Sequence, residues 1–89
     1  MATIPTKTLK EIRALVQIND HGGAYQLAAK ELGDADLAEQ FASINRRNLE
    51  LGHLPIDLYD RRHGLYQRLL AGAKRNLSST NYQQLYASF

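Results

Sequence analysis

Turn signals at four places divide the chain into five segments, and this division constrains the fold more than any other feature of the sequence. The breaks are Gly22 with Gly23, Gly33, the stretch 52–55 and the run 78–81. Within the segments, apolar residues recur with the 3.6-residue period of a helix, and no alternation with a period of two lasts long enough to indicate a strand. The sequence therefore predicts an all-α protein.

Capping residues set the expected limits of the helices. The expected N-terminal caps are Thr8 with Glu11 ahead of a helix over 9–19, Asp34 or Asp36 ahead of the third helix, Asp57 ahead of a helix over 58–77, and Thr80 with Gln83 ahead of the terminal helix. Gly22 and Gly23 are expected to end the first helix, before a second over 24–32. Gly33 and Gly52 are expected to end the second and third, because glycine adopts the left-handed conformation without strain.

Five helices joined by short turns predict a compact orthogonal bundle, and 89 residues allow one domain over 1–89 with a modest core. No heptad pattern lasts for three repeats, which argues against an extended coiled coil. The expected core consists of residues on the apolar arc of each helix. These are Leu15, Val16, Leu27, Leu37, Phe41, Ile44, Leu65 and Leu69.

Composition excludes several classes of function. The chain has no Cys, so a disulfide, a thiolate metal site and a cysteine nucleophile are impossible. Its apolar runs are three residues or fewer, far short of a membrane span, so a soluble cytoplasmic protein without membrane contact is expected. His21, His53 and His63 lack the spacing of metal ligands, and no nucleophile and base share a recognisable pattern. We therefore expect no metal, no cofactor and no enzymatic activity.

Charge is unevenly distributed along the chain. Residues 46–75 carry seven basic and three acidic side chains, whereas the residues before them carry four basic and six acidic ones. Arg61, Arg68 and Arg75 are spaced by seven residues, so they line one edge of the fourth helix about 10 Å apart. This edge is expected either to bind an acidic protein patch or phosphates, or to be a solvated face. Arg62 faces the apolar arc, so its stem is expected to be packed.

An aromatic stripe ends the chain. Tyr82, Leu85, Tyr86 and Phe89 recur at i, i+3, i+4 and i+7, and they include three of only seven aromatic residues in the sequence. Such a stripe must be covered. It is expected either to fold back onto the core of its own domain, or to pack across the axis of a homodimer or into the groove of a partner.

The segment 25–34, followed by the third helix, resembles the helix-turn-helix of small bacterial and phage repressors. Ala29 lies four residues before the turn glycine, Gly33, as in that family. The resemblance implies a helical hairpin whose third helix would enter the DNA groove with its N-terminal turn. The sequence departs from the pattern at Glu39, where the family has an aliphatic residue, and carboxylates at this end of the helix would be repelled by phosphates.

Two functions from different classes follow. The first is a small non-enzymatic regulatory or inhibitory module, of a size common in phages and other mobile elements, that binds a protein partner through the basic edge and the aromatic terminal helix. Its partner-binding residues would be Arg61, Arg68, Arg75, Tyr82, Tyr86 and Phe89. The second is a helix-turn-helix transcriptional regulator, in which Arg46 and Arg47 at the far end of the third helix would touch the DNA backbone.

Overall fold

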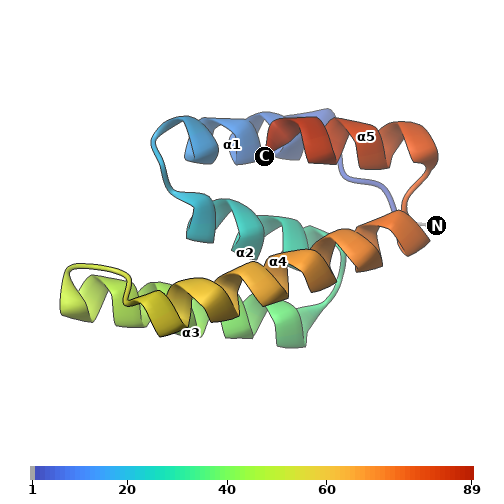
Figure 1. Cartoon of the computed structure of the whole chain (residues 1–89). Coiled ribbons are helices and arrows are strands. Elements are labelled where there is room, and N and C mark those ends of the chain that lie inside the picture. Colours follow the sequence, from blue (N-terminus) through green and yellow to red (C-terminus); the bar gives the residue numbers. More distant parts are fainter. Residues whose placement is uncertain (1) are drawn as a thin grey trace.

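The computed structural model describes residues 2–89 and contains five helices. They are α1 (Thr6–Gln17), α2 (His21–Glu31), α3 (Ala35–Leu51), α4 (Ile56–Asn76) and α5 (Ser79–Ser88). Figure 1 shows α1 and α5 side by side in one layer and α3 and α4 in another, with α2 between them. The part of the chain that is described contains no strand, so the predicted all-α bundle is confirmed.

Helix α2 is central to the bundle because it packs against α1, α3 and α4. Its buried residues are all small, namely Gly22, Ala24, Ala28 and Ala29. Small side chains let the neighbouring helices approach closely. At Gly22 an added methyl group would overlap the side-chain oxygen of Asn45 on α3, so a larger residue would have to displace that side chain.

One cluster of buried apolar residues joins the two layers. Of the predicted core, Leu37, Phe41, Ile44, Leu65 and Leu69 are buried, whereas Leu15, Val16 and Leu27 are half-buried at its margin. Leu15 and Val16 lie in the last turn of α1, and Figure 1 shows that α5 ends before it reaches this turn. Ile4 and Ile12 also belong to the core but were not in the predicted set, and Leu85 is buried, as the first of the two expectations for the terminal stripe required.

The start of α2 corrects one prediction. Gly22 and Gly23 lie inside the first turn of α2 and do not form the turn after α1. The left-handed residue in that turn is Asn19, with φ 64°, a conformation that asparagine tolerates better than most residues. Asp20 then caps α2, because its Oδ1 accepts a hydrogen bond from the Gly23 amide at 2.9 Å.

The turn between α2 and α3 and the end of α3 agree with the predictions. Gly33 and Gly52 adopt left-handed conformations, with φ 77° and 74°. Asp34 caps α3 by accepting a hydrogen bond from the Leu37 amide at 3.1 Å. The sequence predicted the end of α3 at Gly52 and left Asp34 and Asp36 as alternative caps at its start, of which Asp34 is the one observed.

Two helices begin at prolines, and the side chains predicted to cap them do not do so. Helix α1 follows Pro5, and Thr8 is a buried residue within the helix. Helix α4 follows Pro55, and Asp57 lies in its first turn, where its charge suits the helix dipole. Proline at these positions already fixes a φ that is compatible with the start of a helix.

A buried asparagine of α5 hydrogen-bonds to the backbone of the N-terminal segment. The Ile4 amide donates to Asn81 Oδ1 at 2.8 Å, and Asn81 Nδ2 donates to the Ile4 carbonyl at 3.1 Å. We call this pair the terminal clamp. Helix α5 is capped by Ser78, whose hydroxyl accepts from the Asn81 amide at 3.1 Å, and the predicted cap by Thr80 with Gln83 is therefore wrong.

Candidate functional site

Five of the six large apolar side chains that residues 2–89 expose lie at one end of the molecule. They are Ile18, Leu49, Leu51, Ile56 and Tyr59, and the sixth is Tyr86 on α5. The turn between α1 and α2 and the connection between α3 and α4 both lie at this end, on the left of Figure 1. We call residues 18–20 and 49–59 the turn end.

The exposure at the turn end is large and follows from the positions of the residues. Ile18, Leu49 and Ile56 are 74%, 82% and 80% exposed. Ile18 is the C-terminal cap of α1 and Ile56 is the first residue of α4, so each lies beyond the packed part of its helix. Single exposed apolar residues are ordinary, but several gathered together typically mark a surface on which another molecule packs.

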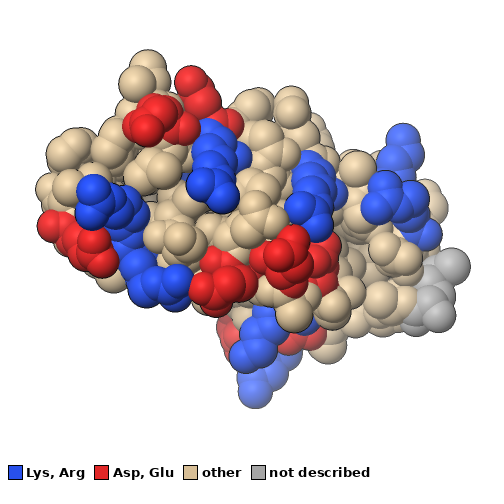
Figure 2. All heavy atoms as spheres, turned by 90° about the horizontal axis from the view of Figure 1, so that it is seen from below, with Lys and Arg blue, Asp and Glu red and all other residues tan. Residues whose placement is uncertain are grey.

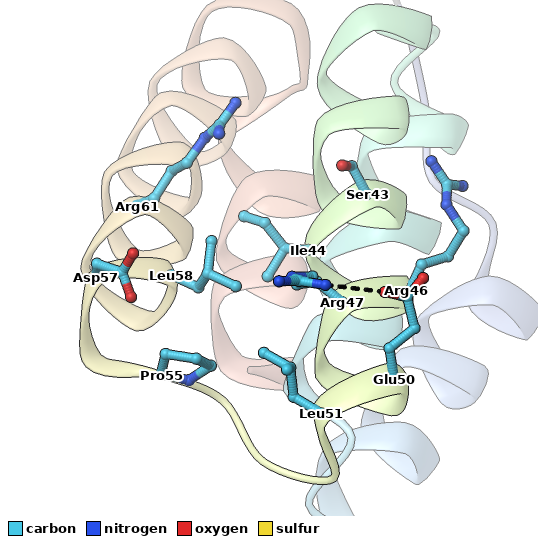
Figure 3. Close-up of a pocket in the computed structure, with 10 residues that line it drawn as sticks. All are labelled: Ser43, Ile44, Arg46, Arg47, Glu50, Leu51, Pro55, Asp57, Leu58 and Arg61. Carbon is cyan, nitrogen blue, oxygen red and sulfur yellow. Dashed lines mark hydrogen bonds and ion pairs between the residues drawn. The ribbon is translucent and has the colours of Figure 1, made fainter.

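A groove of about 440 Å³ lies beside the turn end between α3 and α4. Figure 3 shows Ile44 and Leu58 pointing toward each other across it, with Arg47 and Arg61 reaching toward the gap from the two helices. Arg47 Nη1 lies 3.2 Å from Glu50 Oε2. Arg61 makes no ion pair with any residue from 2 to 89. The groove therefore combines an apolar floor with an arginine that makes no ion pair in the described chain, and its lining also includes the carboxylates Glu50 and Asp57.

Arg62 is held at the turn end by two tyrosine rings. Its guanidinium carbon lies 5.9 Å from the ring centroid of Tyr25 and 5.6 Å from that of Tyr59. Tyr25 also packs against Tyr66 and Phe89, with centroids 4.6 and 5.4 Å apart. Burial raises the pKa of the Tyr25 hydroxyl above its ordinary value, and the nearby Arg62 guanidinium opposes this shift.

The three arginines of the predicted basic edge have different surroundings. Arg68 Nη2 lies 3.3 Å from Asp36 Oδ2 and 3.9 Å from Asp34 Oδ2, so it is paired with the start of α3. Arg61 lies beside the groove, and Arg75 lies toward the opposite end of α4. Figure 2, which shows the molecule from below, has acidic side chains next to basic ones across this face. The edge is thus part of a mixed surface.

Helix α5 turns most of its aromatic stripe toward its own domain. Leu85 is buried, and Tyr82 is half-buried against the core. Phe89 lies edge-on to Tyr25 and Tyr66, with a centroid distance of 5.4 Å to each. Tyr86 is the member of the stripe that stays exposed.

The two residues predicted to contact DNA are both paired with carboxylates, and they point in different directions, because Arg47 reaches into the gap between α3 and α4 whereas Arg46 lies on the outer side of α3. Arg46 points away from the gap between α3 and α4 in Figure 3, and its Nη2 lies 2.8 Å from Glu39 Oε1. Helices α2 and α3 do form the hairpin that the resemblance implies. The first turn of α3 nevertheless presents Asp34 and Asp36, together with the Arg68 that pairs with them.

The turn end was not predicted from the sequence. Ile18 lies within the helix predicted over 9–19, and Leu49 lies next to the apolar arc of the third helix. The sequence pattern was therefore compatible with the burial of both side chains. The exposure of these residues could have been predicted from their positions, because Ile18 precedes Asn19 in a turn and Ile56 follows Pro55 at the start of a helix. Apolar residues at such places lack a helix on their outer side.

Comparisons with known proteins do not indicate a function for this chain. Comparison with protein-family models, with curated proteins and with solved structures finds no match. No helix in residues 2–89 is long and apolar enough to cross a membrane. Over the same residues, no three His, Cys, Asp or Glu side chains lie close enough together to hold a metal ion.

Proposed function

We propose that this protein is a non-enzymatic regulatory or inhibitory module that binds a partner protein through its turn end. The observation that carries this proposal is the gathering of five exposed apolar side chains at one end, while the rest of the described surface exposes one. Burying such residues in an interface removes apolar area from water, which is the main favourable term in protein association.

The surroundings of the turn end indicate what kind of partner fits. Arg61 and Arg62 flank it without an ion pair in the described chain, and Arg47 lies at the adjoining groove. The turn end itself carries Asp20, Glu50 and Asp57, so a fitting partner segment would present apolar side chains and place its carboxylate at Arg61 or Arg62, away from these acidic residues. This replaces the broader expectation of a surface along the whole edge of α4 and α5, because Arg68 and Phe89 are engaged within the chain.

DNA binding is the second candidate, and the observation in its favour is the hairpin formed by α2 and α3. The carboxylates of Asp34 and Asp36 at the start of α3 weigh against it, since this turn would face phosphates. The two candidates differ in salt dependence. Phosphate contacts weaken steeply as salt rises, whereas an interface anchored by apolar side chains is much less sensitive.

Affinity capture from a lysate of the source organism, with and without nuclease, tests the proposal when matched variants are compared. Leu49→Ser combined with Ile56→Ser removes two apolar side chains from the turn end, and Tyr86→Ser removes the exposed aromatic of α5. We expect the double variant to lose about tenfold or more in affinity for the protein that the wild type captures, because each buried large apolar side chain contributes about 1.5–3 kcal/mol.

The same comparison can overturn the proposal. Unchanged capture by the double variant would show that the turn end is not the docking surface. Loss of capture in Tyr86→Ser alone would move the site to α5, and loss on nuclease treatment would favour the nucleic-acid function.

A further inference from the structure

A hollow of about 480 Å³ opens at the turn end, between the start of α2, the end of α3 and the first turns of α4. Its lining includes Asn19, His21, Tyr25, Asn48, Tyr59 and Arg62. Among the described residues that line it there is no carboxylate, and Arg62 is the one with a permanent charge. An anion would therefore meet attraction here without competition from an acidic side chain in the wall.

Arg62 is oriented before any ligand arrives. Its guanidinium lies against the faces of Tyr25 and Tyr59, which restrict the side chain without using its hydrogen-bond donors. Arg46 and Arg68, by contrast, are each paired with a carboxylate, at 2.8 and 3.3 Å. Because the rings already limit its freedom, Arg62 loses less entropy on binding than a mobile surface arginine would.

Two carboxamides add uncharged donors to the same hollow. Asn19 is fixed by its left-handed backbone, and its Oδ1 lies 3.0 Å from His21 Nε2. With the oxygen turned to the histidine, the NH₂ group of Asn19 is left to donate elsewhere. Asn48 contributes a second carboxamide from α3. The hollow offers one positive charge, on the guanidinium, and otherwise neutral donors. Its charge therefore matches a planar group with a single negative charge better than a doubly charged phosphate.

We propose that this hollow binds the carboxylate of an aspartate or glutamate side chain of the partner, with Arg62 as the bidentate donor. The inference rests on the proposed function, since the turn end would bring the partner chain to the mouth of the hollow. The apolar surface of Tyr25, Leu54 and Tyr59 in its wall would limit the access of water to the ion pair, which strengthens the pair relative to one on an open surface.

Titration of the free protein with sodium acetate at constant ionic strength, followed by NMR at the arginine Nε–Hε signals, tests the site directly. The Arg62 signal is expected to saturate at an acetate concentration about tenfold or more below that of Arg13 and Arg75, which is the ratio that one charge-assisted hydrogen bond provides. Acetamide, which has the same shape without the charge, should leave the Arg62 signal in place. Equal responses at all arginines would overturn the site, and saturation by inorganic phosphate at a lower concentration than acetate would overturn its assignment to a carboxylate.

Arg62→Lys keeps the charge but removes the planar fork. It is expected to abolish the acetate-dependent shifts of the Tyr25 and Tyr59 ring signals and to lower partner affinity about tenfold, whereas Arg13→Lys should change neither. The two proposals fail separately. Selective binding of acetate at Arg62 with full partner capture by Arg62→Lys would overturn the role of the hollow in docking. Capture that depends on Leu49 and Ile56, without any acetate preference at Arg62, would overturn the hollow and leave the docking surface standing.

Discussion

Apolar side chains are buried at one end of this bundle and exposed at the other. At the terminal clamp, Ile4 and Leu85 are buried, and the polar atoms of Asn81 and the Ile4 backbone satisfy one another. At the turn end, Leu49 and Ile56 are about four-fifths exposed. The chain thus uses its own N-terminal segment and last helix to cover one end, while no described residue covers the other. This difference assigns the clamp to stability and is the basis of our proposal that the turn end binds a partner.

Removal of the last helix should break the clamped end and have the largest effect. A chain that ends at Ser79 lacks Asn81, Leu85 and Phe89, so Ile4 loses its hydrogen bonds and the core loses its cover. We expect the shortened chain to lose its cooperative thermal transition, as followed by circular dichroism. A truncated monomer that melts like the full chain would show that α5 docks mainly on another molecule and would contradict the comparison.

Phe41→Ala probes the core between the two ends. Phe41 is fully buried, and its ring centroid lies 5.6 Å from that of Tyr25. The substitution should lower the free energy of unfolding by about 3–5 kcal/mol, the usual cost of a large aromatic truncated in a core. Urea denaturation measures this change. A loss below about 1 kcal/mol would be incompatible with the burial of Phe41.

Asn81→Ala isolates the polar part of the clamp. The substitution leaves the amide and carbonyl of Ile4 without their partner, so the free energy of unfolding should fall by about 1–3 kcal/mol. Asn76→Ala is the matched control, because Asn76 is exposed and its side chain donates to the Gly72 carbonyl of its own helix. If the two variants melted at the same temperature, the clamp would contribute nothing to stability.

Leu49→Ser combined with Ile56→Ser should have the smallest effect on stability. Each surface substitution is expected to change the free energy of unfolding by about 0.5 kcal/mol or less, because little area is lost from the folded monomer. The same urea experiment measures it. A combined loss above about 2 kcal/mol would mean that these side chains are structural, and the contrast between the two ends would disappear.

The fold could be predicted to the extent that local signals determine it. Gly33, Gly52 and Asp34 each act on their immediate neighbours, so the C-terminal ends of α2 and α3 were predicted, and Asp34 was one of the two caps expected at the start of α3. Gly22 and Gly23 were read as a turn because glycine usually interrupts a helix. The turn instead lies at Asn19, whose left-handed conformation precedes the Asp20 cap, and Gly22 within the first turn of α2 packs against Asn45 of α3.

The terminal clamp and the candidate site both depend on contacts between residues far apart in the sequence, which no local pattern shows. Asn81 and Ile4 are 77 positions apart, and no local pattern connects them. In the same way, Arg61, Arg68 and Arg75 share a spacing, but Arg68 is paired with carboxylates at the start of α3. The turn end is assembled from two connections far apart in sequence, so its apolar residues appear isolated until the helices are packed.

Site-specific photo-crosslinking tests the central claim that the turn end is the docking surface. A benzophenone side chain would replace either Ile56 at the turn end or Tyr86 on α5, since both positions are exposed and apolar. After irradiation in cells of the source organism, we predict a discrete protein adduct from position 56 and none from position 86. The adduct should disappear when Leu49 and Arg62 are also replaced. An adduct from position 86 alone would contradict the account and place the partner on α5.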